Sequence, residues 1–164
     1  ILALTKTKNV EEDEKLIDLD LIVDDALSSF SHMDNFARLN IEKHLHFDEE
    51  IMLKSSRLSM IVENLISNAI KYQDIQEQQS FIKISTAKEN NSFVLTVEDN
   101  GLGIPAEHQA SLFSMFKRFH SKVSFGSGLG LYMVKKSADI LGGELVFEQP
   151  KKGTRFVLTI PLKA

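Results

Sequence analysis

The 164-residue chain contains no cysteine, which excludes disulfide frameworks, thiolate zinc sites and cysteine nucleophiles. It also lacks an excess of positive charge: 19 Lys and Arg stand against 23 Asp and Glu, for a net charge of -4, which argues against a broad nucleic-acid-binding surface. No apolar run approaches the ~18 residues that a membrane-spanning helix needs. With 43% hydrophobic residues, the chain has the composition of an ordinary globular domain that buries a sizeable core.

Glycine is absent from the first 100 residues, and all eight glycines lie between Gly101 and Gly153. Glycine allows a positive φ angle and lets a ligand approach the backbone closely. The clusters at 101–103 and 126–130 therefore predict loops shaped around a ligand. The glycine-free first half predicts a continuous scaffold.

The hydrophobic periodicity alternates between helical and extended patterns along the chain. Helices are predicted from a cap at Asp20 to about Ala37, from a cap at Ser55 or Ser56 to Ile70, from Pro105 to about Phe116, and from about Gly130 to Leu141. Strands are predicted at Lys15–Leu19, Ile41–Phe47, Ile51–Leu53, Phe81–Ala87, Ser92–Glu98, Leu145–Glu148 and Thr154–Ile160. This order favours an α/β two-layer sandwich, in which about three helices cover one face of a mixed, mostly antiparallel sheet of about five strands.

The helix that follows Ser56 carries a polar stripe beside its apolar face. Asn64, Asn68 and Lys71 fall on this stripe at ~100° of rotation per residue, and Tyr72 lies at its border. An amide oxygen is a hard, neutral metal ligand, and a lysine suits a phosphate. The alternative interpretation is a solvated polar helix face.

Asp99-Asn100-Gly101-Leu102-Gly103-Ile104 ends a predicted strand and turns sharply toward a helix. An aspartate at a strand end can accept a hydrogen bond from an exocyclic amine, while the glycines let a flat ring approach the backbone. The same pattern also occurs in simple tight turns.

The second cluster, Gly126-Ser127-Gly128-Leu129-Gly130, precedes a predicted helix. Free N–H groups at a helix start favour an anion, although a flexible hinge is the alternative. It is not a Walker loop, because no Gly-Lys-Ser/Thr follows, and no strand leads straight into it as in a Rossmann fingerprint.

Taken in order, these motifs resemble those of the sensor histidine kinases. Asn64-x3-Asn68-x2-Lys71-Tyr72 resembles the N box, Asp99-x-Gly101-x-Gly103 the first glycine box, Phe113-x2-Phe116 the F box, and Gly126-x-Gly128-x-Gly130 the second glycine box. Gly153-Thr154-x-Phe156 and Ile160-Pro161-Leu162 resemble the family's last strand. The resemblance covers roughly residues 15–162.

The resemblance implies a Bergerat-type fold that binds ATP with Mg²⁺. Asp99 would bind the adenine amine with support from Thr154, and Asn68 would ligate Mg²⁺ with Asn64 beside it. The family's remaining contacts would fall on Lys71, Tyr72 and Arg118 for the phosphates, and on Gly101, Gly103, Ile104, Gly126, Ser127, Gly128, Leu129 and Gly130 for the nucleotide cradle. Asn64, Lys71 and Arg118 would serve catalysis, and residues from about 117 to 127 would form a mobile ATP lid.

The resemblance further implies that the phosphoryl acceptor lies outside this chain. None of the five histidines is followed by the acidic residue and proline that are typical of the acceptor. We therefore expect residues 1–14 to be the end of the dimerisation hairpin's second helix with its connector, and residues 15–164 to be the catalytic ATP-binding domain. The first residue is not Met, which agrees with a fragment.

The expected partners are the histidine-containing dimerisation domain of the same kinase and a response regulator receiver domain. The fragment is expected to contact neither nucleic acid nor membrane. We expect a cytoplasmic location for it, whether or not the full-length protein is membrane-anchored, and a homodimeric full-length protein.

Three competing functions are compatible with the same fold. The first is an ATP hydrolase like the gyrase, Hsp90 and mismatch-repair ATPases, which would need a general-base glutamate four residues before the metal-binding asparagine, where this chain has Asn64. Glu63 is one residue away and is expected to point toward solvent. The second is a serine protein kinase, and the third is a non-catalytic nucleotide-binding module.

Overall fold

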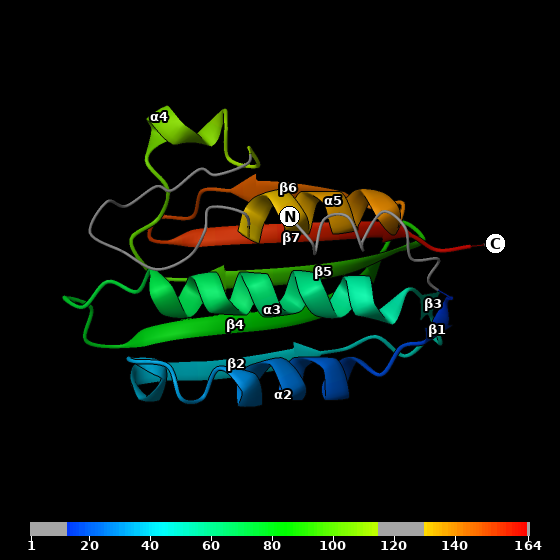
Figure 1. Ribbon diagram of the computed structural model, residues 1–164, viewed down its shortest axis with the longest axis horizontal. Helices are drawn as coiled ribbons and strands as arrows, with labels where there is room; N and C mark the ends of the chain where they lie inside the picture. The colour runs from blue at the N-terminus through cyan, green and yellow to red at the C-terminus, as the bar shows by residue number, and fades with distance from the viewer. Residues whose placement is uncertain (1–12, 115–129, 164) are drawn as a thin grey trace, which may run out of the picture.

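The computed structural model describes residues 13–114 and 130–163, which form two layers (Figure 1). One layer is a five-stranded sheet in the order β2-β4-β5-β7-β6. Its strands are β2 (Leu39–Leu45), β4 (Ser80–Glu89), β5 (Ser92–Asp99), β6 (Glu144–Glu148) and β7 (Thr154–Pro161). β2 runs parallel to β4 and the other neighbours are antiparallel, so the predicted mixed, mostly antiparallel sheet is confirmed.

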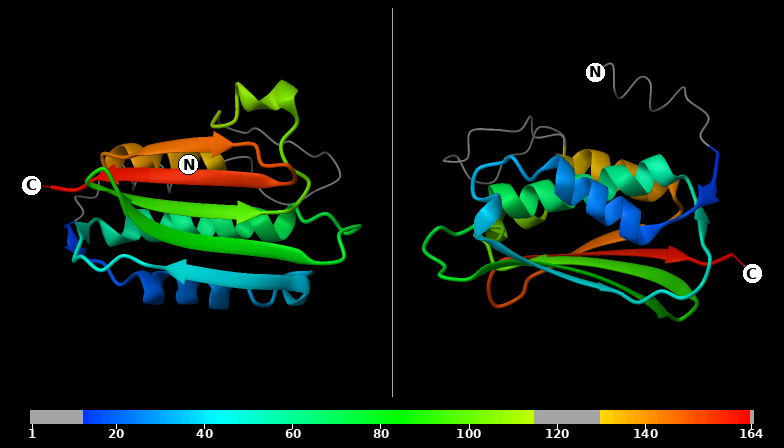
Figure 2. Two further views of the ribbon diagram at one scale, coloured as in Figure 1. Left: turned by 180° about the vertical axis from the view of Figure 1, so that it is seen from behind. Right: turned by 90° about the horizontal axis from the view of Figure 1, so that it is seen from below.

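Three helices form the second layer and lie on one face of the sheet (Figure 2). They are α2 (Leu19–Ser29), α3 (Ser55–Lys71) and α5 (Gly130–Ile140). Two shorter helical elements are the 3-10 helix η1 (Phe36–Arg38) and α4 (Ala106–Gln109). A separate antiparallel pair is formed by β1 (Lys15–Leu16) and β3 (Met52–Leu53). No helix among the described residues is long and apolar enough to cross a membrane.

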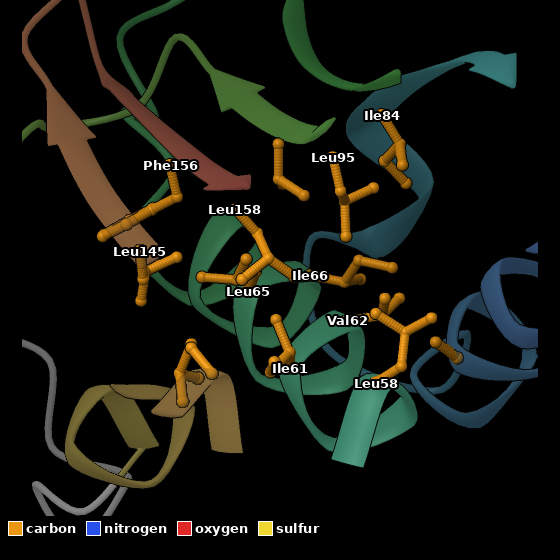
Figure 3. Close-up of a cluster of buried hydrophobic side chains, with 14 of the residues drawn as sticks. Leu58, Ile61, Val62, Leu65, Ile66, Ile84, Leu95, Leu145, Phe156 and Leu158 are labelled. Carbon is orange, nitrogen blue, oxygen red and sulfur yellow. The ribbon is translucent and has the colours of Figure 1, made fainter. Parts of the chain in front are cut away.

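The core lies between α3 and the sheet, and the predicted apolar face of α3 supplies its centre. Leu58, Ile61, Val62 and Ile66 are fully buried, and Leu65 is nearly so. Figure 3 shows these side chains meeting those of the sheet, namely Ile84, Leu95, Leu145, Phe156 and Leu158. Because each fully buried side chain of this size contributes about 1.5–3 kcal/mol, this face fixes α3 on the sheet and with it the polar stripe beside it.

Two predicted helix starts are wrong. α2 begins at Leu19 with Asp18 as its N-cap, since the Asp18 carboxylate accepts a hydrogen bond from the Leu21 N–H at 3.1 Å, whereas Asp20 already lies in the first turn. α3 begins at Ser55, and its N-cap residue Lys54 makes no side-chain capping bond. The predicted caps Ser55 and Ser56 therefore lie in the first turn of α3 instead of before it.

Two predicted helix ends are also wrong. α2 ends at Ser29 instead of Ala37, because the chain turns through residues 30–35 and reaches Asn35 with a φ of 69° before η1. Ser, Asp and Asn in that stretch favour local hydrogen bonds over a continuing helix. α4 is only four residues long and is followed by turns up to Ser114, while Phe116 lies outside the described residues.

The turn between β4 and β5 and the turn after α5 both have the residues that their geometry requires. Asn90 and Asn91 both have positive φ, at 49° and 60°, which is the geometry that two-residue hairpin loops need between β4 and β5. The predicted glycine end of α5 is confirmed, since Gly142 has a φ of 75° and its N–H donates to the Asp139 carbonyl.

Four chain segments meet at one end of the molecule, on the left in Figure 1. They are the end of α3, the end of β5, the start of α5 and the start of β7. Asp99 and Thr154 are directly opposite each other in the β5–β7 pairing, and the Leu102 N–H donates to the Tyr72 carbonyl at 2.9 Å. This hydrogen bond joins the end of α3 to the first glycine cluster.

Candidate functional site

The last residue of β5, Asp99, is a buried carboxylate with only 8% of its surface exposed. Its Oδ1 accepts a hydrogen bond from the Gly101 N–H at 2.9 Å, and its Oδ2 accepts one from the Thr154 hydroxyl at 2.7 Å. Burial raises the pKa of the Asp99 carboxyl, and these hydrogen bonds oppose that rise. An acceptor held in this way is suited to one further donor, such as an exocyclic amine.

Gly101 lies where the end of α3 approaches β5. A Cβ atom at this position would overlap the Tyr72 carbonyl oxygen and would lie 3.0 Å from the Asp99 Oδ1. Only glycine therefore permits the Leu102–Tyr72 hydrogen bond and the Gly101–Asp99 hydrogen bond together.

Gly153 makes an equally close approach from the β6–β7 turn. It has a φ of 90°, and a Cβ atom there would overlap the Asp99 carbonyl oxygen. A Cβ on Gly103, which has a φ of 75°, would lie 3.2 Å from the Gly153 carbonyl oxygen. Asp99, Gly101, Gly153 and Thr154 thus form a tightly packed unit, which we call the carboxylate corner.

Asn64, Asn68 and Lys71 are all half-buried along α3, beside its apolar face; we call them the amide stripe. The Asn64 Nδ2 donates to the Met60 carbonyl at 2.8 Å. A Cβ on Gly130, the first residue of α5, would lie 3.2 Å from the Asn64 Oδ1, so the start of α5 lies against the stripe. Burial lowers the pKa of the Lys71 ammonium.

The structure brings most of the predicted site residues to one end of the sheet. Tyr72 caps the end of α3, and its N–H donates to the Asn68 carbonyl at 3.0 Å. Ile104 packs against the core, and its carbonyl accepts a hydrogen bond from the Gln109 side chain. The predicted contacts that lie outside the described residues are Arg118, Gly126, Ser127, Gly128 and Leu129, together with the predicted lid.

Two residues at this end were not predicted as site residues. The sequence predicts Gly153 only as part of the last strand, yet a Cβ there would overlap the backbone of Asp99. Asn100 accepts from the Phe81 N–H at 2.9 Å and donates to the Gln79 carbonyl at 2.8 Å, so it joins the glycine cluster to the start of β4. The sequence signal for Gly153 is a glycine directly before the strand that pairs with Asp99. The role of Asn100 has no such local signal, because it depends on a contact between segments that are distant in the sequence.

The donor set fits a purine nucleotide with a hard divalent cation. The carboxylate corner offers a buried acceptor beside a glycine-lined backbone, and the amide stripe offers neutral amide oxygens and a lysine. Amide oxygens are suitable Mg²⁺ ligands, which commonly combine with phosphate oxygens and waters in nucleotide sites. Tyr72 and the Leu102–Tyr72 hydrogen bond connect the two regions.

A comparison with protein families finds a match for the part of the chain that contains these residues. Residues 53–164, from β3 onward, match the model of the histidine kinase-, DNA gyrase B-, and HSP90-like ATPase family. The chain belongs to this family. The matched segment contains the amide stripe, the carboxylate corner and both glycine clusters. The predicted resemblance to the ATP-binding domain of sensor histidine kinases is therefore confirmed at the level of the family.

The curated relatives of this histidine kinase-like ATPase domain include sensor kinases. The aerobic respiration control sensor protein ArcB of Escherichia coli K12 is 31% identical over 160 residues, which cover 93% of this chain and 20% of ArcB. The autoinducer 2 sensor kinase/phosphatase LuxQ of Vibrio harveyi is 34% identical over 131 residues, which cover 76% of this chain and 15% of LuxQ. The chain therefore spans about a fifth or less of the length of these relatives.

Solved structures share the fold. The mycobacterial sensor histidine kinase MprB has a TM-score of 0.76 at 23% identity, over 91% of this chain and 99% of the MprB chain. The Acinetobacter baumannii histidine kinase AdeS has a TM-score of 0.78 at 24% identity, over 99% of this chain and 74% of that chain. Full-length ShkA, solved in complex with AMPPNP, has a TM-score of 0.77 at 19% identity, over 94% of this chain and 32% of that chain.

Proposed function

We propose that this domain binds Mg-ATP and donates the γ-phosphoryl group to a histidine on a dimerisation domain outside the chain, as part of two-component signal transduction. The names of the relatives ArcB and LuxQ support a sensor-kinase setting. The AMPPNP in the structure of ShkA supports an adenine nucleotide as the ligand of this fold. Residues 1–14 would be the end of the dimerisation hairpin and its connector, and residues 15–164 the catalytic domain.

The observation that carries this proposal is the carboxylate corner. Asp99 is buried, and its two oxygens are already held by Gly101 and Thr154. The remaining acceptor capacity of this carboxylate suits the adenine amine, which guanine replaces by a carbonyl oxygen. Adenine would thus be selected by a hydrogen bond that guanine, with a carbonyl oxygen at the same ring position, cannot donate from there.

The amide stripe would serve the triphosphate end. Asn68 would hold Mg²⁺ through its amide oxygen. Asn64, one turn earlier on α3 and next to the start of α5, would lie beside it. Lys71 and Tyr72, at the end of the same helix, would contact phosphate oxygens, while Ile104 and the glycines would line the nucleotide cradle. When bound, Mg²⁺ supplies neutralisation of phosphate charge. The chain's own contribution is to orient the phosphates and to add positive charge.

The same helix argues against a dedicated ATP hydrolase. The position four residues before Asn68 is Asn64, whose amide nitrogen donates to the Met60 carbonyl. Glu63 is exposed, and α3 directs it away from its buried face. A general base must lie within hydrogen-bonding reach of the water that it activates, so we expect slow hydrolysis.

Calorimetric titration of the chain with AMPPNP, with and without Mg²⁺, tests the nucleotide part of the proposal. We expect Mg²⁺-dependent binding, and we expect Asp99→Ala to lose the preference for ATP over GTP. No binding at millimolar AMPPNP would overturn the proposal, and retained adenine selectivity in Asp99→Ala would overturn the role of Asp99.

Incubation with ATP and a histidine-containing hairpin domain tests the phosphotransfer part. Phosphohistidine is labile in acid and stable in base, so this signature on the hairpin is the expected result. Hydrolysis of ATP without label on any hairpin would instead favour a dedicated ATP hydrolase.

A further inference from the structure

We propose that the β6–β7 turn, residues 149–153, is a positioning element that sets the adenine selectivity of the site by holding Thr154 on Asp99. This inference rests on the proposed function, because it assigns a role in nucleotide recognition. Two side-chain contacts from different parts of the chain tether the turn, and neither contact involves a side chain predicted to bind the nucleotide.

The turn lies directly against the carboxylate corner. Gly153 packs so closely on the Asp99 backbone that a Cβ would overlap the Asp99 carbonyl oxygen, and its own carbonyl faces Gly103. Thr154 follows Gly153 in the chain and donates its hydroxyl hydrogen to the Asp99 Oδ2 at 2.7 Å. A displacement of the turn would therefore move the Thr154 hydroxyl relative to the carboxylate.

The first tether is an ion pair between Lys152 and Asp74, which lies in the loop after α3. The Lys152 side chain is 45% exposed and that of Asp74 is 17% exposed, so solvent screens the pair only in part. The contact lowers the pKa of Asp74 and raises that of Lys152. Glu77, in the same loop, also raises the pKa of Lys152, so the loop has two acidic groups near this lysine. Arg38, in η1, is a second cation near Asp74 and lowers its pKa further.

The second tether is a chain of glutamine hydrogen bonds on the other side of the turn. The Gln149 Nε2 donates to the Gly153 carbonyl at 3.3 Å, and the Gln109 Nε2 donates to the Gln149 Oε1 at 3.2 Å. The same Gln109 nitrogen donates to the Ile104 carbonyl at 3.1 Å. The turn is thereby joined to α4 and to the end of the first glycine cluster.

Charge reversal provides the sharpest test. Titrations with AMPPNP and with its guanine counterpart GMPPNP compare the wild-type chain, Lys152→Glu, Asp74→Lys and the double variant. We expect Lys152→Glu to weaken AMPPNP binding about fivefold with a much smaller effect on GMPPNP, which is the scale of one partly exposed ion pair. The double variant restores the attraction between positions 74 and 152, but it also places the new lysine near Arg38 and the new glutamate near Glu77, so we expect it to recover only part of the lost AMPPNP affinity. Lys151→Glu is the matched control, because Lys151 is an exposed neighbour on the same turn, and we expect it to leave both affinities unchanged.

A purely structural role predicts a different pattern. If Lys152→Glu weakened both analogues equally, or if it bound AMPPNP as the wild type does, the inference would be wrong while the proposed function stood. Gln149→Ala tests the second tether independently, with the same selective loss expected, should the double variant fail to fold. A wild-type chain that ignored AMPPNP would overturn the proposed function itself, which keeps the two failures distinguishable.

Discussion

The carboxylate corner and the amide stripe are built in opposite ways. At the carboxylate corner, residues from β5, β7 and the first glycine cluster interlock through backbone contacts, and Asp99 has donors on both of its oxygens. The amide stripe lies along one helix, and all three of its members are half-buried. One region has a fixed shape before any ligand arrives, whereas the other presents side chains that water still reaches.

This difference agrees with what each region is proposed to bind. A flat base is recognised through a small number of oriented hydrogen bonds, and a rigid, buried acceptor gives the largest penalty to the wrong base. A triphosphate with its cation is hydrated and highly charged, so partly solvated ligands suit it. We therefore expect substitutions at the carboxylate corner to change both stability and selectivity, and substitutions at the amide stripe to change affinity alone.

The largest expected effect follows from adding one methyl group to the carboxylate corner. Gly153→Ala forces a Cβ into the Asp99 carbonyl oxygen at a φ of 90°, and we expect a loss of about 2–5 kcal/mol in the free energy of unfolding. Gly142→Ala is the matched control, since Gly142 has a φ of 75° but no atom within 4 Å of an added Cβ, and it should lose only about 1 kcal/mol. Urea denaturation measures both losses. Equal losses in the two variants would mean that backbone strain alone, and not the contact with Asp99, accounts for Gly153.

The amide stripe is tested by Asn68→Ala. We expect Mg²⁺-dependent AMPPNP affinity to fall at least about tenfold, because even residues that merely support metal ligands cost that much when they are changed. Affinity without Mg²⁺ and thermal stability should stay close to wild type. Glu63→Ala, at an exposed position of the same helix, is the control. A loss of equal size with and without Mg²⁺ would contradict a role for Asn68 at the cation.

Asp99→Asn separates stability from recognition. The amide can keep two of the contacts, because Oδ1 still accepts from Gly101 and Nδ2 can donate to the Thr154 hydroxyl oxygen. It offers no carboxylate to the adenine amine or to the Thr154 backbone N–H. We expect AMPPNP affinity to fall about tenfold, while the free energy of unfolding at pH 7 is equal to or higher than that of the wild type.

The pH dependence of that comparison follows from the raised pKa of Asp99. Because the folded state holds the proton more strongly than the unfolded chain, ionised Asp99 costs stability above the folded-state pKa. As the pH falls through the raised pKa toward the unfolded value, this cost disappears, so the stability advantage of Asp99→Asn should shrink. Wild-type affinity for AMPPNP should fall over the same range, since protonation removes the acceptor. If the free energy of unfolding changed with pH in parallel for the two proteins, burial would not destabilise the ionised form of Asp99.

The two regions also differ in how far the sequence alone predicts them. The amide stripe follows from helical periodicity, because its residues lie three and four positions apart beside Ile61, and the structure has them on one helix beside the core. Asp99 and Gly101 are predicted from an equally local pattern, because they lie two positions apart in the sequence. The Asp74–Lys152 pair joins residues 78 positions apart, and Asn100 joins its turn to Gln79 at 21 positions. Such contacts depend on how the sheet is ordered, which periodicity does not contain.

Local signals can also be degenerate, as the start of α2 illustrates. Asp18 and Asp20 are equally good caps by residue type, but Asp18 has the extended backbone, with φ -108° and ψ 97°, that an N-cap needs, whereas Asp20 lies within the helix. The end of α2 has the same character, because residues 30–35 are short on strong helix formers but contain no proline or glycine to mark the break. The position of a helix end is then decided by packing, which the sequence pattern records only weakly.

The smallest expected effect concerns Lys71, at the end of the amide stripe. Lys71→Met removes a positive charge but keeps most of the length of the side chain, and we expect AMPPNP affinity to fall about three- to tenfold with adenosine affinity unchanged. Because burial lowers the pKa of Lys71, wild-type affinity for AMPPNP should also weaken as the pH rises through that lowered value, whereas the variant should show no such change. Lys83→Met, at an exposed position on β4, is the control. An equal loss for adenosine and AMPPNP would place Lys71 with the carboxylate corner in supporting the base, and the division of the site into a base-selecting and a charge-neutralising region would then fail at this residue.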